Sequence, residues 1–164
     1  MMLKVHIAGM TMDPSSNTPI IILKSDKDER TLPIWIGLLE ATSIASALQG
    51  IEFERPMTHD LFKNFMEMLN HRVTRVEVCE LKDSTFFAKI HFVSGDRMFT
   101  MDARPSDAIA IALRFKAPMY VDETVIDQTM KSEQQPGEAV DKSAEGQKWA
   151  EYLESLSPED FGKV

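Results

Sequence analysis

The shortness of the links between the first three strand-like segments constrains the fold more than any other feature. Residues 3–7 alternate apolar and polar side chains, and residues 20–24 and 31–36 are mostly apolar. Turn-forming residues are concentrated in two six-residue stretches between these segments, residues 13–18 and 25–30. They are shorter than the dozen or more residues that a parallel crossover needs. These segments are therefore predicted to form an antiparallel meander.

Beyond this meander, the pattern changes to single helices separated by runs of strands. Helices are predicted where apolar side chains recur every three or four residues, and strands where apolar and polar residues alternate. The strict strand–helix alternation of a doubly wound sheet does not occur. The fold class expected is therefore α+β: a compact single domain with a mixed, largely antiparallel sheet and about three packed helices, followed by a short C-terminal helix. The predicted helices span residues 39–49, 58–69 and 108–116, and the further strands span residues 73–81, 85–93, 97–102 and 119–121.

Charge divides the chain into a nearly neutral body and an acidic tail. Residues 1–121 carry 15 acidic and 14 basic side chains, whereas residues 122–164 carry 11 acidic and 4 basic ones. The net charge of −8 and the lack of a long Lys/Arg cluster argue against tight binding to duplex nucleic acid. Residues 1–123 are expected to form the folded domain, residues 124–142 a polar, acidic linker, and residues 143–164 an amphipathic helix and tail. The partner of this tail is not identified by the sequence.

Several classes of protein are disfavoured by what the sequence lacks. The single cysteine, Cys79, excludes an internal disulfide and a cysteine-based zinc site within one chain. The longest apolar runs fall far short of the ~20 residues of a membrane span, and the first residues do not have the pattern of a signal peptide. A cytoplasmic location without membrane contact is therefore expected. No Gly-x-Ser-x-Gly elbow, His-Glu-x-x-His helix or P-loop occurs.

The densest group of chemically active residues is Asp102-Ala-Arg-Pro-Ser-Asp107, between a predicted strand and a predicted helix. Such a junction collects backbone N–H groups and short polar side chains, and it is a common place for an anion or a metal ion. The same residues have an ordinary structural interpretation, because proline in the first turn and Ser or Asp at the cap are usual at the start of a helix. Spacing alone favours the structural interpretation.

Other polar residues stand at the ends of predicted elements. Arg55, His59 and Asp60 lie at the start of the second predicted helix, Glu40 at the start of the first, and Asp83 in a hairpin turn. Each has a structural explanation, because acidic residues stabilise the first turn of a helix and Asp is common in turns. Together they also supply the carboxylates, base and cations that phosphodiester hydrolysis uses. Adjacent helix positions point about 100° apart, so His59 and Asp60 are not expected to bind one metal ion.

A series of short motifs follows in order along most of the chain. They are Ser16-Asn-Thr-Pro-Ile-Ile-Ile-Leu23, Leu32-Pro-Ile-Trp-Ile-Gly37, Arg55-Pro-Met-Thr-His-Asp-Leu61, Lys82-Asp-Ser-Thr-Phe-Phe-Ala88, Asp102-Ala-Arg-Pro-Ser-Asp-Ala-Ile109 and Ala117-Pro-Met-Tyr-Val121. In this order they resemble the bifunctional nuclease domain family, from the N-terminus to about Val121. The resemblance implies an α+β domain, DNase or RNase activity as in some members, chiefly from plants, and a homodimer.

The candidate site combines this resemblance with the chemistry of the residues. The reaction expected is hydrolysis of phosphodiester bonds assisted by Mg²⁺ or Mn²⁺. Single-stranded DNA or RNA is the expected substrate, because fewer phosphates need to be neutralised. The predicted catalytic residues are His59, Asp60, Arg104 and Ser106; the predicted metal ligands are Asp102 and Asp107, with Asp83 and Glu40 as second choices; and the predicted phosphate-binding residues are Arg55 and Arg104.

Two alternatives remain open at the level of sequence. The first is a non-enzymatic module with a stress or regulatory function, which binds a small anion or a protein partner and uses the acidic tail for interaction. The second is that the polar motifs mainly cap helices and build a dimer. A lost cap costs about 1 kcal/mol of stability and would affect nothing else.

Overall fold

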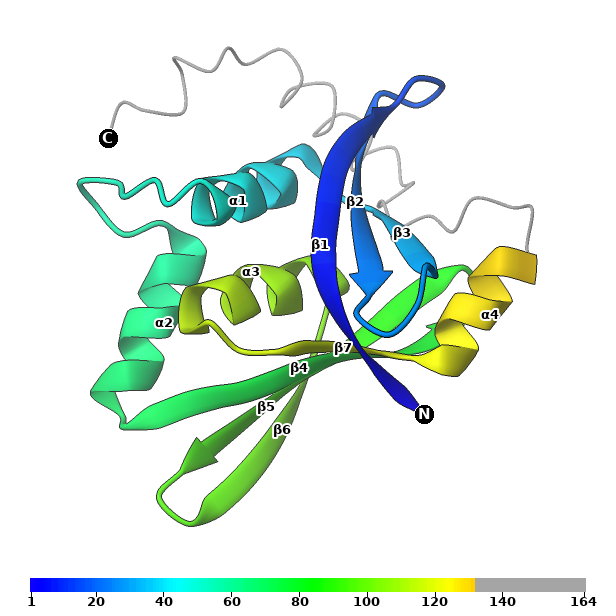
Figure 1. Cartoon of the computed structure of the whole chain (residues 1–164). Coiled ribbons are helices and arrows are strands. Elements are labelled where there is room, and N and C mark those ends of the chain that lie inside the picture. The colour runs from blue at the N-terminus through cyan, green and yellow to red at the C-terminus, as the bar shows by residue number, and fades with distance from the viewer. Residues whose placement is uncertain (132–164) are drawn as a thin grey trace.

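The computed structural model describes residues 1–131, which form seven strands and four helices (Figure 1). Every helix and strand predicted for the first 121 residues is present, and the α+β fold class is confirmed. The elements are β1 (Met2–Asp13), β2 (Thr18–Ser25), β3 (Thr31–Trp35), α1 (Leu38–Leu48), α2 (Thr58–Met68), β4 (His71–Lys82), β5 (Thr85–Ser94), β6 (Arg97–Ala103), α3 (Pro105–Phe115), β7 (Met119–Asp122) and α4 (Glu123–Lys131).

The strands form one mixed sheet in the order β3-β2-β1-β7-β4-β5-β6. The meander of β1, β2 and β3 is antiparallel, as predicted, and so is the series β4, β5 and β6. β7 joins the two halves, because it pairs antiparallel with β1 and parallel with β4. The chain returns to the middle of the sheet through α3, which lies between β6 and β7 in sequence. This placement of β7 is what makes the sheet mixed.

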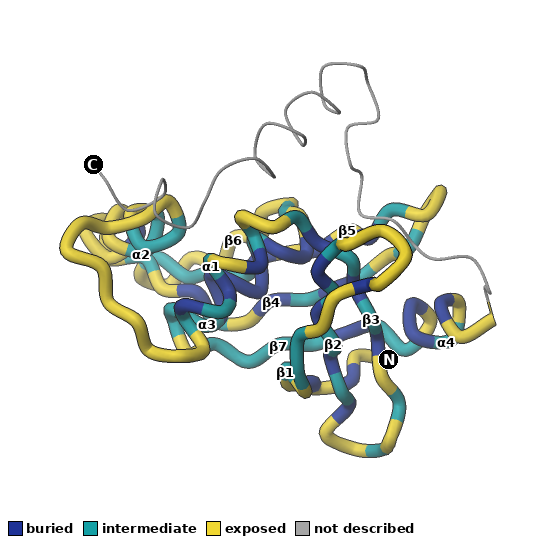
Figure 2. Tube along the Cα trace, turned by 90° about the horizontal axis from the view of Figure 1, so that it is seen from above, coloured by how far each residue is buried: buried dark blue, intermediate teal, exposed yellow. Residues whose placement is uncertain are grey.

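Helix α3 is the centre of the core. Five consecutive residues of this helix, Ala108 to Ala112, are at most 5% exposed, and Figure 2 shows the buried stretch running through it. The small side chains let neighbouring elements approach closely on several sides. α3 contacts α1, α2, β4 and β5, and it therefore positions the polar side chains of three helices relative to one another.

Helix α4 is the main difference from the sequence-based expectation. The linker was expected to begin at residue 124, but residues 123–131 form a helix that buries Val125 and Ile126 at 1% exposure. α4 is also joined to the β2–β3 turn, because Arg30 Nη2 donates to Glu123 Oε1 at 2.8 Å. The rest of the expected linker and the expected C-terminal helix lie outside the described residues.

The two edges of the sheet differ in how far they are covered. β3 contains Pro33, buries Leu32 and Ile34 and is contacted by α4. β6 is exposed along nearly its whole length, including Met98, Phe99 and Met101. Exposed apolar edge strands are sites where another chain can pair. Within residues 1–131, no helix combines the length and the apolarity needed to cross a bilayer.

Candidate functional site

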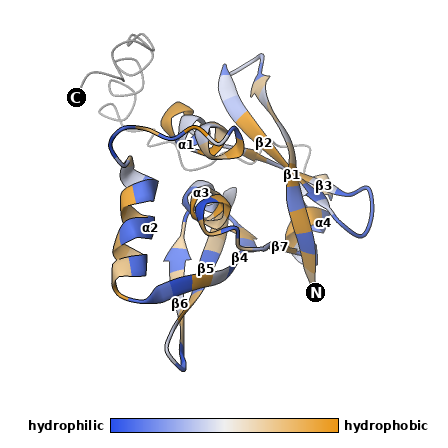
Figure 3. Ribbon diagram, turned by 60° about the vertical axis from the view of Figure 1, so that its left-hand side comes forward, coloured by the Kyte–Doolittle hydropathy of each residue, from blue (hydrophilic) through white to orange (hydrophobic). Residues whose placement is uncertain are grey.

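Helices α1, α2 and α3 pack together and share one continuous set of polar side chains, which we call the three-helix polar network. α3 contacts both other helices, and Figure 3 shows α1 and α2 on two sides of α3. Glycine at position 37 makes room for this set, because a Cβ there would collide with the Glu40 carboxylate. The members are Glu40 and Ser43 of α1, His59 and Asp60 of α2, Arg104 immediately before α3, and Asp107 and Arg114 of α3.

His59 lies at the centre of the network. Its Nε2 is 2.8 Å from Oδ1 of Asp107, and its Nδ1 is 2.7 Å from Oγ of Ser43. An ionised carboxylate only accepts hydrogen bonds, so Nε2 carries the proton and Nδ1 of the neutral ring is an acceptor. The hydroxyl of Ser43 must then donate to Nδ1. The three residues form a relay in which a carboxylate orients an imidazole and the imidazole polarises a hydroxyl.

Asp107 is also held by a cation that is partly open to solvent. Arg104 donates from Nε to Oδ2 of Asp107 at 2.9 Å and from Nη1 to Oε1 of Glu40 at 2.9 Å. The hydrogen bond from His59 lowers the pKa of Asp107 most, burial opposes this, and Arg104 lowers it further, with a result of about 2. Asp107 is therefore ionised at neutral pH. The Arg104 side chain is 55% exposed, so its guanidinium can still meet an anion from solution.

Arg114 closes the other end of the network. Its Nε donates to Oδ1 of Asp60 at 2.6 Å, and its Nη2 donates to Oγ of Ser43 at 3.2 Å. Its side chain is only 7% exposed. Burial raises the pKa of Asp60, but the hydrogen bonds from Arg114 and from the backbone N–H of Met57 outweigh it, so the net shift is downward. Asp60 thus both stabilises the start of α2 and pairs with a buried cation.

The structure brings together five of the residues predicted from sequence and leaves the others apart. Asp102 pairs across the sheet with Lys89, and its neighbour Ala103 pairs with the buried Ala88. Because successive strand residues face opposite sides, Asp102 points away from the buried face on which α3 packs. Asp83 occupies the two-residue β4–β5 turn at a positive φ of 48°, a conformation that Asp tolerates well. Ser106 is fully buried in the first turn of α3, and Arg55 is exposed in the loop before α2. The five predicted residues that belong to the network are Glu40, His59, Asp60, Arg104 and Asp107.

The four carboxylates predicted as metal ligands do not fit a single ion in this arrangement. Within the described chain, no group of three or more His, Cys, Asp or Glu side chains is placed to hold a metal. Asp107 and Glu40 already accept hydrogen bonds from Arg104, while Asp83 and Asp102 lie elsewhere on the sheet. Mg²⁺ prefers several oxygen ligands at one point, and these residues do not provide it.

Ser43 and Arg114 are members of the network that the sequence interpretation missed. Both lie inside helices whose pattern is mainly apolar, so they were not grouped with the polar ends of elements. A usable signal existed for Arg114: seven residues after Asp107, it returns to the same face of a helix. Ser43 has no comparable signal, because its role depends on the approach of α2.

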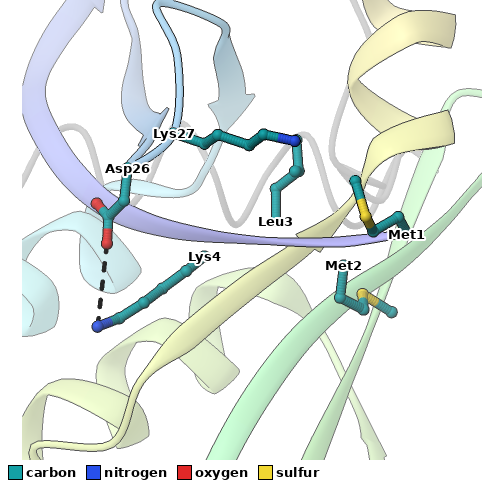
Figure 4. Close-up of a pocket in the computed structure, with 6 residues that line it drawn as sticks. All are labelled: Met1, Met2, Leu3, Lys4, Asp26 and Lys27. Carbon is teal, nitrogen blue, oxygen red and sulfur yellow. Dashed lines mark ion pairs between the residues drawn. The ribbon is translucent and has the colours of Figure 1, made fainter.

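A shallow pocket of about 260 Å³ lies at the start of β1, away from the network (Figure 4). It is lined by Met1, Met2, Leu3, Lys4, Asp26 and Lys27. Lys4 and Asp26 face each other there at 4.0 Å, and Asp26 also accepts a hydrogen bond from His6 at 2.6 Å. Nothing in this lining resembles the relay around His59.

Comparison with known proteins connects this geometry to a family. The family model described as the Bifunctional nuclease domain matches residues 21–134. An uncharacterized protein of Mycobacterium tuberculosis is 39% identical over 163 residues, which is 96% of this chain and 97% of that protein.

Plant proteins resemble the chain more distantly. Bifunctional nuclease 1 of Arabidopsis thaliana is 30% identical over 108 residues, and Bifunctional nuclease 2 of Oryza sativa subsp. japonica is 28% identical over 117 residues. These matches cover 63% and 69% of this chain but only 33% and 36% of the plant proteins, so the chain corresponds to about a third of their length. The family model covers most of the folded domain, including every member of the three-helix polar network, and the chain belongs to the bifunctional nuclease domain family.

Proposed function

We propose that this chain hydrolyses phosphodiester bonds in nucleic acids and that the three-helix polar network is its active site. The observation that carries the proposal is the Ser43–His59–Asp107 relay with the half-exposed Arg104 beside it. Membership of a family whose plant members are called bifunctional nucleases supports the choice of substrate.

Each group in the network has a role in such a reaction. Asp107 keeps the proton of His59 on Nε2 and compensates the positive charge that develops when the ring takes up a second proton. Arg104 contacts the phosphate and stabilises the charge of the transition state, which requires a cation reachable from solution. No step uses a metal ion, because the carboxylates of the network are already engaged by arginine.

Single-stranded DNA or RNA is the proposed substrate. The body of the chain is nearly neutral, with 15 acidic and 14 basic side chains in residues 1–121. A duplex presents more charge per unit length than a single strand and requires more phosphate contacts for tight binding. The unpaired bases of a single strand can also stack on protein side chains, and this binding energy does not require basic residues. A single strand therefore suits a nearly neutral chain better than a duplex does.

The test is cleavage of fluorescent single-stranded DNA and RNA by purified full-length protein, in Mg²⁺, in Mn²⁺ and in chelator. We expect the His59→Gln variant to lose roughly 100-fold or more in rate, the size of a general-base contribution. The matched control is His6→Gln, which removes a histidine bonded to a carboxylate at an exposed position. Equal rates for wild type and His59→Gln would refute the proposal, provided that both proteins melt at similar temperatures.

A non-enzymatic binding module is the second candidate. The observation that favours it is that the carboxylates and guanidinium groups of the network are paired with one another, as in a purely structural clamp between helices. Under this alternative, any cleavage observed with wild type would persist in His59→Gln. The same variant would lower the melting temperature instead.

A further inference from the structure

Ser43 is the one member of the network with a hydroxyl, and among residues 1–131 it is the neighbour from which His59 can take a proton. Nε2 of His59 already bears a proton and faces Asp107 at 2.8 Å, so Nδ1 is the basic nitrogen. Nδ1 lies 2.7 Å from Ser43 Oγ. A base with both nitrogens engaged can act on a substrate only through the hydroxyl that it polarises.

The surroundings of Ser43 Oγ also suit a group that develops negative charge. Arg114 Nη2 lies 3.2 Å from this oxygen and, being a donor only, it must donate to it. The oxygen therefore accepts from a guanidinium while its proton points at an imidazole. Donation from a cation favours the alkoxide-like form that attacks phosphorus.

A second arrangement elsewhere in the described chain looks similar but differs in the place of its guanidinium group. On β5 and β6, Thr100 Oγ1 lies 3.1 Å from His91 Nδ1. His91 Nε2 is 2.9 Å from Oε2 of Glu77, and Arg75 donates to Oε1 of Glu77 at 2.6 Å. The guanidinium in this arrangement binds the carboxylate, whereas Arg114 donates to the Ser43 hydroxyl itself. Thr100 and His91 serve as matched controls.

We propose that Ser43 Oγ is the nucleophile of the phosphodiester hydrolysis, an inference that rests on the proposed function. In the first step, Oγ bonds to phosphorus, the bond from phosphorus to the leaving nucleoside oxygen breaks, and the Ser43 proton passes through His59 Nδ1 to that oxygen. In the second step, water attacks the phosphoserine diester, its proton passes through His59, and Ser43 leaves with its hydroxyl restored. The products are a nucleotide phosphomonoester and an alcohol, with one water consumed.

The first experiment labels the full-length protein with diisopropyl fluorophosphate and locates the adduct by peptide mass spectrometry. In this reaction Oγ bonds to phosphorus and fluoride leaves, while His59 accepts the proton. We expect one diisopropylphosphoryl group on Ser43, formed roughly 100-fold more slowly in His59→Gln and at an unchanged rate in His91→Gln. An unlabelled Ser43, or the same rate in His59→Gln, would overturn the inference without any reference to nuclease activity.

The second experiment separates the inference from the proposed function. Wild type, Ser43→Ala, Ser46→Ala and Thr100→Ala are mixed with labelled single-stranded oligonucleotide, quenched with acid and examined for a covalent protein–nucleotide adduct. Ser46 lies one turn further along α1 and donates to the backbone oxygen of Ser43. We expect cleavage and adduct to be lost in Ser43→Ala alone. Cleavage that persists in Ser43→Ala but disappears in His59→Gln would refute the nucleophile and keep the nuclease, whereas absence of cleavage in wild type would refute the nuclease.

Discussion

Replacing Asp107 by asparagine removes the negative charge next to His59 while keeping the shape of the side chain. Asp107 accepts from His59 at 2.8 Å and from Arg104 at 2.9 Å. Hydrogen bonds to an ionised acceptor are stronger than those to a neutral amide. We therefore expect Asp107→Asn to loosen the contact between α2 and α3 and to destabilise the folded chain.

The pKa of Asp107 sets the size of this effect. Its fall from 3.8 to about 2, caused first by the His59 hydrogen bond, corresponds to at most about 2.5 kcal/mol at about 1.4 kcal/mol per unit. The side chain is 31% exposed, so screening by solvent reduces the expected loss to about 1–2 kcal/mol. Because the pKa is lower in the folded state, the stabilisation is complete above about pH 5 and is lost as the pH falls through about 2.

The assay is urea unfolding of wild type and Asp107→Asn at a series of pH values from neutral to acidic. At pH 7 we expect the variant to be less stable by about 1–2 kcal/mol and to melt about 3–6 °C lower. This difference should shrink steadily in acid. Asp26→Asn is the control, because Asp26 bonds to His6 with both side chains at least 40% exposed, and such a pair contributes little. A difference that persists unchanged at low pH, or a control with the same effect, would refute the reasoning.

Three further predictions concern other parts of the chain. Ile126→Ala truncates a side chain of α4 that is 1% exposed, and it should lower the free energy of unfolding in urea by about 2–5 kcal/mol. A loss under about 1 kcal/mol would mean that α4 does not pack on the sheet in solution. Millimolar Mg²⁺ or Mn²⁺ should leave the melting temperature unchanged, because the described carboxylates form no ligand group; a rise that Glu40→Gln abolishes would contradict this. The homodimer implied by the family resemblance is expected to use the exposed edge strand β6. Met101→Lys should therefore convert the dimer to a monomer, as measured by light scattering. A dimer that survives this change, or a monomeric wild type, would count against that interface.

Local patterns in the sequence were sufficient for most of the secondary structure. The apolar periods of the helices and strands depend only on the geometry of each element, and short links dictate antiparallel pairing. α4 was missed because its buried positions, Val125, Ile126 and Thr129, are few and lie among charged residues. Its helix is stabilised by packing on β3, β4 and β7, and packing against strands so far away in the chain leaves little trace in a local pattern.

The candidate site was likewise predicted in part from local patterns, and its remaining features depend on tertiary packing. The sequence by itself determined which residues have useful chemistry and roughly where helices begin. Asp60 was correctly placed in the first turn of its helix, whereas Asp107, expected at a cap, lies in the first turn of α3. The sequence could not determine which of these residues meet. Asp102 and Asp107 are five residues apart, yet strand alternation directs Asp102 away from the face on which α3 packs.

Only the tertiary structure decided that Ser43, His59 and Asp107, from three different helices, would form one relay. The physical reason is that spacing along the chain fixes the direction of a side chain within its own helix. Its partners depend on how the helices pack around the small residues of α3.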